Sequence, residues 1–590
     1  MNPASLGAFE PGNQTILCKA SRIRLQSPIN LWTFQAKKPK KWSSLVGLAP
    51  LSSSQMNTQL TGHSLVSGIS IQETDSVFQA INPANDQALD PAYKQLSSDS
   101  VDAVALQAKK AFSSYRNCSG AEKAAFLRQI ADNIEAVVED LVERMPSETA
   151  LPEPRVRGEA GRTMGQLRLF ASLVEEGSWA DARIETAQPD RQPLPKPDVR
   201  SLLSPLGPVV VFCASNFPLA FSVAGGDTAA ALAAGCPVIV KAHHSHPGTA
   251  EIVGQAIMKA VESCQMPAGT FSLIYGSGRE IGTALVQHPA VKAVGFTGSR
   301  TGGTALMKVA AERPEPIPVY AEMSSINPVV ILPGALQAKG PQLAAGLHGS
   351  VTLGLGQFCT NPGLVFLPAG DSANSFAEIL KGALTETAPG HSLNAGIAES
   401  YRKTLQEIAA LNQDGVTVHH DASNTGGDQK CQVGTALAQV TTEAFLSNPA
   451  VHQEAFGPST ILVTYQNPEE LVRALSTLEG QLTGTVHGLE NELGGATEII
   501  SALQERVGRI LFGGFPTGVE VCHSMVHGGP FPSTSDGRST SVGSMAIQRF
   551  VRAVCFQSAP DGMLPDELKN SNPLAISRLV NGTRSTDPIS

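Results

Sequence analysis

One cysteine lies in a sequence that could bend the chain and expose a thiol. Cys359 follows Gly356-Gln-Phe358 and precedes Thr360-Asn-Pro362, so that a glycine and a turn-forming Asn-Pro pair flank it. A thiol on such a bend can attack a carbonyl carbon if its pKa is lowered. The alternative is a small buried residue, which is the usual place of a free cysteine.

Two glutamates stand in apolar surroundings. Glu322 ends the run Pro318-Val-Tyr-Ala-Glu322, and Glu454 opens the segment Glu454-Ala-Phe-Gly-Pro458. Burial at the end of a strand raises the pKa of a carboxyl group towards neutrality, which suits a general base. An internal ion pair is the alternative for each glutamate.

A glycine-rich turn could accept a diphosphate. Gly298-Ser-Arg-Thr-Gly302-Gly303 follows the apolar run 291–296 and precedes a predicted helix at 304–312. Glycines let the backbone approach a diphosphate, and a helix N-terminus supplies free N–H groups. The spacing is not Gly-x-Gly-x-x-Gly, so the usual dinucleotide-binding fingerprint is absent and a plain strand–turn–helix junction remains an alternative.

Histidines and cysteines form no metal-binding pattern in the sequence. Histidines cluster at His243, His244 and His246, and again at His523 and His527. Zinc needs three or four ligands in a fixed geometry, and neither cluster has the paired cysteine or carboxylate spacing that would complete one. We therefore predict surface-loop histidines and no metal. The nine cysteines lack a Cys-x-x-Cys pair, which favours a reducing compartment over a disulfide framework.

The elements that must position these groups alternate between strand and helix. Short apolar runs predict strands at 209–212, 237–241, 272–275 and 291–296. Helical patterns lie between them at 223–234 and 249–261. This alternation predicts parallel strands with crossover helices, hence a doubly wound α/β sheet, and a second α/β series follows Glu322.

Two further patterns precede this sheet. Apolar residues recur every three to four positions over 121–145 and over 161–176, which predicts two amphipathic helices. Prolines and alternating residues between about 181 and 203 predict an extended hairpin or arm.

Length and composition bound the function. The 590 residues are 42% apolar and 16% charged, which suits a globular chain of two to four domains. The longest apolar run, Ala229–Val240, contains Gly235 and Pro237 and is too short to span a membrane. A net charge of −9 argues against a general phosphate-backbone binder.

Both ends of the sequence differ from the rest. Residues 1–55 carry seven Lys or Arg and one acid, Glu10. A disordered basic tail, an organelle transit peptide and sequence upstream of a true start at Met56 all remain open. The polar stretch 571–590 is predicted to be loose.

Several motifs occur together in one order along the chain. They are Asn216-Phe-Pro, Lys241, Phe296-Thr-Gly-Ser299, Glu322, Gly356-Gln-x-Cys359 and Glu454-x-Phe-Gly-Pro458. This combination resembles the aldehyde dehydrogenase superfamily over residues 60 to 565. Residues 148–153 and 214–227 are most similar to its α-ketoglutaric semialdehyde (2,5-dioxovalerate) dehydrogenase branch.

The resemblance implies an α/β aldehyde dehydrogenase fold, with a Rossmann-like cofactor domain, an α/β catalytic domain and a β oligomerisation arm. We expect a basic disordered extension at 1–58, a dinucleotide-binding domain at 59–181 and 206–321, an arm at 182–205 and 544–560, a catalytic domain at 322–543 and a C-terminal tail at 561–590. We also expect a cytoplasmic homodimer or homotetramer with a small-molecule aldehyde as substrate and no nucleic-acid or membrane partner.

The resemblance assigns the chemistry to three residues. Cys359 would add to the aldehyde to form a thiohemiacetal, and hydride transfer to the nicotinamide would leave a thioester. The Asn216 amide and the Cys359 backbone N–H would stabilise the oxyanion. Glu322 would activate the water that releases the acid.

The resemblance also implies a set of binding residues. Those for the cofactor are Lys241 at the adenosine ribose, Gly298, Ser299 and Gly303 at the diphosphate, Glu454 at the nicotinamide ribose, and Phe456. Those for the aldehyde are Phe217 and Phe358.

Two positions favour NADP over NAD, with NAD as the alternative. Many NAD-preferring relatives place a glutamate three residues after the lysine, and here that position is His244. Without a carboxylate there, the repulsion of a 2′-phosphate is removed. Arg279 resembles an arginine that pairs with this phosphate in NADP-using relatives.

The expected substrate follows from the resemblance to this branch and from one arginine. Arg162 falls where many relatives carry an apolar residue facing the aldehyde tunnel, and a guanidinium there suits a carboxylate. We therefore expect 2,5-dioxopentanoate (α-ketoglutaric semialdehyde) to be oxidised to 2-oxoglutarate, although an ion pair of Arg162 with Glu159 is the alternative. The usual Glu-Leu-Gly-Gly and Pro-Phe-Gly-Gly motifs read Glu322-Met-Ser-Ser and Pro530-Phe-Pro-Ser here.

Three other functions remain open. One is an NADP-dependent fatty or broad-specificity aldehyde dehydrogenase. The others are a cysteine thioesterase or esterase without hydride transfer, and a catalytically silent binding protein.

Overall fold

The computed structural model describes residues 58–69, 71–411, 415–423 and 429–589. The extension predicted for residues 1–58 therefore lies, except for Thr58, outside the described residues. Met56–Ser590 form one unit by their contacts, and this unit contains every element below. Within the described ranges, no helix is both long enough and apolar enough to cross a bilayer.

The first α/β part is built on a six-stranded sheet in the order β1-β8-β7-β6-β9-β10. The strands are β1 (Leu65–Val66), β6 (Val209–Phe212), β7 (Val238–Lys241), β8 (Phe271–Ile274), β9 (Ala293–Thr297) and β10 (Val319–Glu322). All neighbours pair in parallel except β1 with β8. The predicted doubly wound sheet is confirmed, because the apolar runs seen in the sequence become its central strands.

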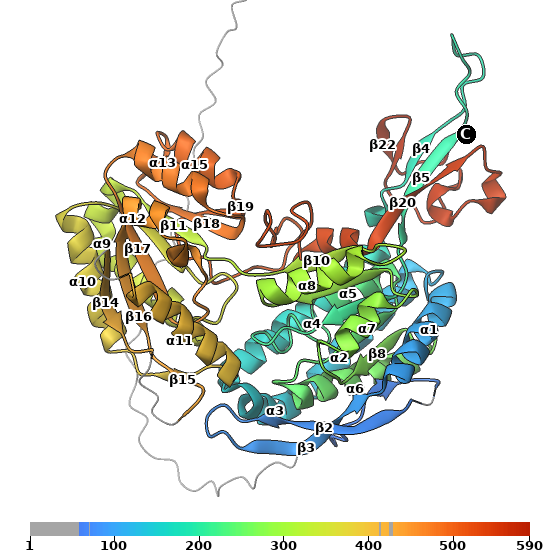
Figure 1. The fold of residues 1–590 in the computed structure, drawn as a ribbon. Coiled ribbons are helices and arrows are strands. Elements are labelled where there is room, and N and C mark those ends of the chain that lie inside the picture. The colour runs from blue at the N-terminus through green and yellow to red at the C-terminus, as the bar shows by residue number, and fades with distance from the viewer. Residues whose placement is uncertain (1–57, 70, 412–414, 424–428, 590) are drawn as a thin grey trace, which may run out of the picture. The chain divides into compact units, whose positions relative to one another are not determined.

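Helices cover both faces of this sheet (Figure 1). They are α1 (Ser98–Tyr115), α2 (Gly120–Ala136), α3 (Val138–Thr149), α4 (Glu153–Glu176), α5 (Gly226–Ala234), α6 (Pro247–Ser263), α7 (Ile281–Gln287) and α8 (Arg300–Ala311). Alternate strand residues face opposite layers, as the two-residue period of a strand requires. Val209 and Val211 pack with α2, α4, α5 and α6, whereas Val210 and Val294 pack with α1, α7 and α8.

The helices before the sheet differ from their predicted bounds. The pattern at 121–145 becomes two helices, because the backbone at Val137 leaves helical geometry between α2 and α3. Ser119 and Glu122 form a capping box that begins α2. α4 begins eight residues before its predicted start, with Pro152 at its N-cap. A hairpin of β2 (Glu73–Ile81) and β3 (Ala88–Leu96) precedes them all.

The second α/β part has a seven-stranded sheet in the order β14-β16-β17-β12-β11-β18-β19. Its strands are β11 (Pro328–Ile331), β12 (Leu364–Pro368), β14 (Val416–Asp421), β16 (Ala436–Thr441), β17 (Ser459–Tyr465), β18 (Gln481–His487) and β19 (Val507–Phe512). All neighbours are parallel except β14 with β16. Two short strands, β13 (Gly390–His391) and β15 (Gln432–Val433), pair beside it.

This sheet also separates two apolar layers. Its helices are α9 (Pro333–Thr352), α10 (Asp371–Thr385), α11 (Ala395–Ala409), α12 (Thr442–Ser447), α13 (Pro468–Thr477), α14 (Glu490–Leu493) and α15 (Thr497–Gln504). Val329 and Val365 pack with α9 and α10, while Val330 and Phe366 pack with α11, α12, α13 and α15. The second α/β series predicted after Glu322 is therefore present.

A third sheet of five strands has the order β20-β5-β4-β21-β22. Its strands are β4 (Arg183–Glu185), β5 (Val199–Pro205), β20 (Val551–Gln557), β21 (Arg578–Val580) and β22 (Thr583–Ser585). The extended hairpin predicted near 181–203 is present as β4 and β5, which pair in antiparallel fashion. The prediction of a loose C-terminal stretch is wrong, because β21 pairs with β4 and the buried Arg578 donates to the carbonyls of Lys569 and Asp587.

Candidate active site

The carboxyl ends of the parallel strands bring most of the predicted residues to one edge of the first sheet. Arg279 follows β8, and Lys241 and His244 lie at the end of β7, the strand beside it. Asn216 follows β6, the glycine-rich turn Gly298–Gly303 follows β9, and Glu322 ends β10; these strands lie side by side in the order β8, β7, β6, β9, β10. Open parallel sheets bind their ligands at this edge. Segments far apart in the sequence are therefore gathered by topology alone.

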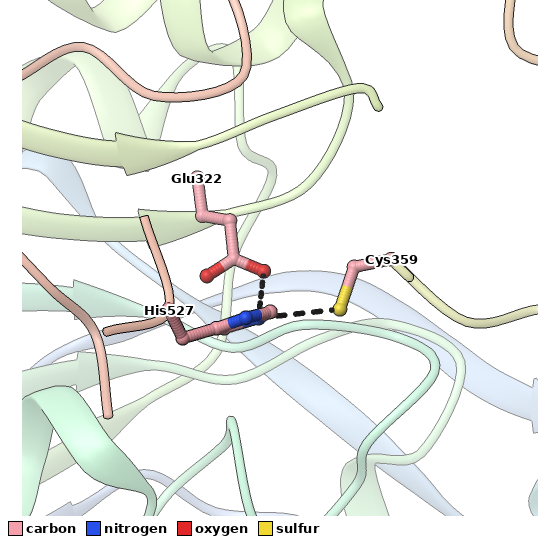
Figure 2. A group of neighbouring side chains, drawn as sticks. All are labelled: Glu322, Cys359 and His527. Carbon is pink, nitrogen blue, oxygen red and sulfur yellow. Dashed lines mark hydrogen bonds and ion pairs between the residues drawn. The ribbon is translucent and has the colours of Figure 1, made fainter. Parts of the chain in front are cut away.

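Glu322 is the last residue of β10, and its side chain is fully engaged. It is 3% exposed; Ser541 Oγ donates to its Oε2 at 2.7 Å, and His527 Nε2 lies 3.0 Å from its Oε1 (Figure 2). Burial acts to raise the pKa of this carboxyl, but His527, Ser541 and Cys359 together hold it below its ordinary value. The pKa shift towards neutrality expected from the sequence is therefore wrong, and Glu322 is a carboxylate ready to accept a proton.

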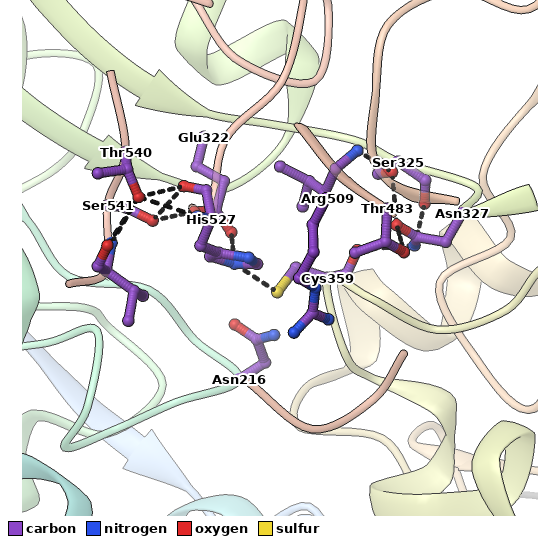
Figure 3. Close-up of polar contacts among 12 residues, drawn as sticks. Asn216, Glu322, Ser325, Asn327, Cys359, Thr483, Arg509, His527, Thr540 and Ser541 are labelled. Atoms are coloured by element: carbon purple, nitrogen blue, oxygen red, sulfur yellow. Dashed lines mark hydrogen bonds and ion pairs between the residues drawn. The ribbon is translucent and has the colours of Figure 1, made fainter. Parts of the chain in front are cut away.

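Cys359 lies on a tight bend between η2 (Leu353–Gly356) and β12. Gly356 has φ +65°, and a Cβ there would lie 2.2 Å from the Gly457 carbonyl oxygen, so only glycine allows this approach. Asn327 Nδ2 donates to the Cys359 carbonyl at 2.9 Å and fixes the loop from the other side (Figure 3). The bend predicted from Gly356 and Asn361-Pro362 is thus present.

The surroundings of Cys359 favour its thiol over its thiolate. Its Sγ lies 3.4 Å from His527 Nε2. Burial raises the pKa of the thiol well above its ordinary value, and the Glu322 carboxylate raises it further, while Arg162 acts in the opposite direction. A proton acceptor beside the sulfur is therefore required before it can act as a nucleophile.

His527 is the site residue that sequence reasoning missed. It was predicted on a surface loop, but it is 2% exposed between the thiol and the carboxylate. Its backbone N–H donates to Thr540 Oγ1 at 2.8 Å, which fixes the segment that carries the ring. No spacing pattern could have marked it, because 168 residues separate it from Cys359 and 205 from Glu322.

Asn216 follows β6 and points towards the loop of Cys359 (Figure 3). It is 9% exposed, and its Nδ2 donates to the Gln357 carbonyl at 3.1 Å. Gln357 is itself held, since its Oε1 accepts the Leu393 N–H at 3.0 Å. The amide is therefore next to the nucleophile's loop, and its action on an oxyanion stays a prediction.

A cavity of about 560 Å³ opens onto the thiol. Cys359, His527 and the three predicted aldehyde residues line it: Arg162, Phe217 and Phe358. The structure therefore brings these three residues together with the nucleophile.

The guanidinium of Arg162 is only partly satisfied inside this cavity. Its Nη1 donates to the Val519 carbonyl, whereas its buried Nε and Nη2 make no hydrogen bond among the described residues. The alternative pairing with Glu159 is not seen, because Glu159 forms its ion pair with Arg155 at 2.9 Å.

Arg155 packs against two aromatic rings of the cavity wall. Its guanidinium carbon lies 4.3 Å from the ring centre of Phe217 and 4.6 Å from that of Phe358. It also donates to the Asn216 carbonyl at 3.2 Å, and Glu159 accepts the Leu219 N–H at 2.9 Å. One arginine on α4 thus fixes both the loop of Asn216 and the cavity wall.

A second cavity, of about 700 Å³, lies beside the N-terminus of α8. Ser299, Ser325 and Glu454 are among the residues that line it. Ser299 caps α8 by accepting the Gly302 N–H at 3.2 Å. A Cβ on Gly303 would lie 2.6 Å from Met323 Sδ, so glycine lets the first turn of α8 pack directly on β10.

Glu454 lines both the cavity at α8 and an adjacent one, whereas Phe456 lines only the adjacent one. Burial raises the pKa of the Glu454 carboxyl to about 8. Phe456 lines an adjacent cavity inside the second α/β part and is not among the residues around the cavity at α8. Its predicted contact with the cofactor stays a prediction.

Lys241, predicted at the adenosine ribose, and the two residues predicted to select NADP lie on neighbouring strands and loops. Lys241 ends β7, is 7% exposed, and burial lowers the pKa of its amine. His244 follows it on the surface, with its ring centre 4.4 Å from that of His243. Arg279 is exposed in the loop after β8, the strand beside β7. Their roles stay predictions.

Comparison with known proteins decides the family. The model of the aldehyde dehydrogenase family matches residues 70–547. The chain belongs to the aldehyde dehydrogenase family. This family oxidises aldehydes with NAD or NADP, and the reaction class expected from the sequence is thereby confirmed.

Two similar proteins of this family carry the same name in different bacteria. Alpha-ketoglutaric semialdehyde dehydrogenase 2 of Azospirillum brasilense is 50% identical over 89% of this chain and 99% of its own length. Alpha-ketoglutaric semialdehyde dehydrogenase of Acinetobacter baylyi is 45% identical over 88% of this chain and 98% of its own. The branch expected from the sequence is therefore the branch of these relatives.

Solved aldehyde dehydrogenase structures share the fold. Betaine aldehyde dehydrogenase of Staphylococcus aureus in complex with NAD⁺ has a TM-score of 0.71 at 19% identity, covering 85% of this chain and 96% of its own. 3,6-Anhydro-L-galactose dehydrogenase in complex with NADP has a TM-score of 0.70 at 21% identity, covering 84% and 99%. The aldehyde dehydrogenase fold predicted from the sequence is confirmed.

Of the two motifs in which this aldehyde dehydrogenase departs from the family pattern, the one that begins at Glu322 contains a serine with a structural role. Ser325 Oγ donates to Asn327 Oδ1 at 2.8 Å and accepts the Leu482 N–H at 3.0 Å. Asn327 is the residue that fixes the Cys359 loop, so this serine links β18 to the nucleophile. The loop at Pro530–Ser533 is tied to the end of β10, because the Met323 N–H donates to the Ser533 carbonyl at 2.8 Å.

Proposed function

We propose that this enzyme oxidises α-ketoglutaric semialdehyde (2,5-dioxopentanoate) to 2-oxoglutarate. The observation that carries this proposal is the Arg162 guanidinium, whose residue lines the cavity of Cys359 and whose buried Nε and Nη2 have no hydrogen-bond partner among the described residues. The substrate carries a carboxylate at the end opposite its aldehyde, and a planar guanidinium binds a carboxylate well. The names of the two relatives at 50% and 45% identity support the same substrate.

The cavity beside α8 fits a nicotinamide dinucleotide. A helix N-terminus donates backbone N–H groups to diphosphate oxygens, and Ser299, Arg300 and Thr301 at the start of α8 line this cavity. Glu454 would hold the nicotinamide ribose, and Lys241 the adenosine ribose. When bound, the cofactor supplies the hydride acceptor for the reaction.

The first half-reaction belongs to Cys359. Its thiol proton passes to the Glu322 carboxylate, which hydrogen-bonds with it, and the sulfur then adds to the aldehyde carbon. The Asn216 amide and the Cys359 N–H would stabilise the oxyanion of the thiohemiacetal, a contribution of about 3 kcal/mol for one donor. Loss of the hydride leaves a thioester on Cys359.

The second half-reaction belongs to Glu322. Once its proton has been released, the carboxylate takes a proton from water, which attacks the thioester and frees the acid. His527 and Ser541 each bind one oxygen of this carboxylate, so they orient it and keep it ionised. We therefore assign His527 a positioning role.

We propose NADP as the preferred cofactor. His244 stands where a carboxylate would repel a 2′-phosphate, and Arg279 is exposed on the loop after the neighbouring strand. The measurement is kcat/KM for NADP and for NAD with the same aldehyde. A higher value with NAD would refute the preference and leave the aldehyde chemistry intact.

We also propose a cytoplasmic homodimer or homotetramer that assembles through the five-stranded sheet. Leu194 and Met563 are 69% and 76% exposed in the segments that surround this sheet, which suits burial against a second copy. The eight described cysteines are all free, which suits a reducing compartment. Light scattering on the purified chain measures the mass, and a monomer would refute the assembly.

The experiment that tests the proposed reaction is a substrate panel. We expect reduced cofactor to form fastest with α-ketoglutaric semialdehyde and far more slowly with uncharged aldehydes of similar length. Equal specificity constants across the panel would favour a fatty or broad-specificity aldehyde dehydrogenase instead. Release of acid from a thioester without any cofactor reduction would favour an esterase.

A further inference from the structure

Three different metal-binding groups converge at the nucleophile. The Cys359 sulfur, the His527 imidazole and the Glu322 carboxylate each offer one ligand atom, and these atoms all lie within 4.8 Å of one another (Figure 2). They come from the end of β10, the bend after η2 and the segment before η4 (Ser544–Phe550). Spacing in the sequence could not reveal this set, which is why the histidines alone pointed to no metal site.

Two of the three separations between these ligand atoms are close to the edges of a zinc tetrahedron. Zinc binds sulfur at about 2.3 Å and nitrogen or oxygen at about 2.0–2.2 Å, so its ligands stand about 3.4–3.6 Å apart. Sγ and Nε2 are 3.4 Å apart, and Nε2 and Oε1 are 3.0 Å apart. The first pair already fits, the second would have to open by a few tenths of an ångström, and the sulfur and the carboxylate oxygen lie within 4.8 Å of each other.

The ligand chemistry selects zinc over the alkaline-earth ions. Magnesium and calcium prefer sets of six or more oxygen ligands, whereas a thiolate with an imidazole suits zinc. The fourth position would face the aldehyde cavity, because Cys359 and His527 both line it. Water could fill that position, as it does in zinc sites with three protein ligands.

The surroundings make such a site reversible. Ser541 supports the Glu322 carboxylate from outside, but the buried Nδ1 of His527 has no hydrogen-bond partner among the described residues. Arg162 and Arg509 both interact electrostatically with Cys359 and would oppose a second cation. Histidines that ligate a metal almost always donate their other ring N–H to a partner, and loss of that partner weakens the affinity for the ion.

We propose that Zn²⁺ binds reversibly to Cys359, His527 and Glu322 and blocks the nucleophile. The Cys359 S–H bond breaks and its proton leaves to solvent, while a Zn–S bond forms and the imidazole and carboxylate replace two waters of the ion. No electron is transferred. The sulfur lone pair is then bound to zinc and cannot attack the carbonyl carbon of an aldehyde that enters the cavity.

Direct binding is the first test, with zinc chloride as the probe and the full chain without cofactor or aldehyde. Competition with a chromophoric zinc indicator should show one site per chain. Cys359→Ser and His527→Ala should each weaken this site by roughly tenfold or more. Cys522→Ser and His523→Ala are matched controls on the segment before His527, and they should leave the affinity unchanged.

Cobalt(II) in place of zinc shows whether the sulfur is a ligand. The wild-type chain should develop a thiolate-to-cobalt charge-transfer band, and Cys359→Ser should lack it. Melting curves of all variants show whether each is folded, and Glu322→Gln gives an independent third ligand variant. Unchanged zinc affinity in folded Cys359→Ser and His527→Ala, or no band in the wild type, would overturn the proposal.

The activity test rests on the proposed function, whereas the binding and cobalt tests do not. Zinc should inhibit aldehyde oxidation, a chelator should restore it, and zinc should slow alkylation of Cys359 by iodoacetamide. Zinc binding with full activity would overturn the proposed block. If the chain binds zinc as described but oxidises no aldehyde, the proposed function fails and the metal site stands.

Discussion

Replacement of Arg162 by methionine tests the link between the buried guanidinium and the substrate. Methionine keeps an unbranched side chain of similar length and removes all N–H donors. In the native enzyme, Nη1 is taken by the Val519 carbonyl, so Nε and Nη2 remain for a ligand. A carboxylate that accepts from both makes a two-point, charge-assisted contact.

The magnitude follows from these two donors. A hydrogen bond to a charged group contributes about 1.5–3 kcal/mol, and loss of one partner of a buried charge pair costs about 2–5 kcal/mol. Since every 1.4 kcal/mol is about tenfold, kcat/KM for the acidic aldehyde should fall by at least about 30-fold. For an uncharged aldehyde of similar length it should change little or rise, because the desolvated cation is gone.

The assay compares two substrates in three proteins. The wild type, Arg162→Met and Arg157→Met are each measured with α-ketoglutaric semialdehyde and with the uncharged aldehyde. Arg157 is the matched control, since it lies on the same helix but is paired with Glu139 and Glu153 at the surface. Parallel losses for both substrates in Arg162→Met would show that the arginine only supports the fold, and the reasoning would be refuted.

Four further changes test the chemistry. Cys359→Ser should abolish aldehyde oxidation but keep cofactor binding, since a hydroxyl lacks the nucleophilicity of the thiol. Aldehyde oxidation at the wild-type rate in this variant would contradict the role of Cys359. Glu322→Gln should give a burst of reduced cofactor followed by a slow steady state in a stopped-flow trace, because only thioester hydrolysis needs the base; a uniform loss without a burst speaks against this role. His527→Gln should move the acidic limb of the kcat–pH profile to higher pH, because the native imidazole lowers the pKa of Glu322 and its removal lets that pKa rise; an unmoved limb would mean that His527 does not tune the base. Arg279→Ala should raise KM for NADP and leave KM for NAD unchanged, and equal effects on both would make the arginine structural.

The sequence predicted the central sheet well because its strands are short, continuous apolar runs. The runs at 209–212 and 237–241 become β6 and β7 within one residue. The residues that follow these strands could be placed at one edge once the parallel order was expected, and Asn216 and Lys241 lie there. Local pattern and topology were sufficient for these parts.

Contacts between distant segments could not be predicted. His527 has no local pattern that marks it, and its burial depends on two partners far away in the chain. The same holds for Asn327, whose amide holds the Cys359 loop while its Oδ1 accepts from Ser325. The lowered pKa of Glu322 could not be predicted for the same reason. The sequence indicated that its carboxyl is buried, but not that distant polar side chains would form hydrogen bonds with it.

The strand β21 closes the edge of β4 with residues made at the other end of synthesis. Thr186 and Asn581, which hydrogen-bond beside this pairing, are separated by 395 residues. Before β21 has been synthesised, one edge of β4 therefore has unpaired backbone groups. An extended segment of another chain could form hydrogen bonds with them. A chain that stopped before Arg578 would keep both α/β parts and yet leave the backbone groups on this side of β4 without their partner strand, open to pairing with a second such chain.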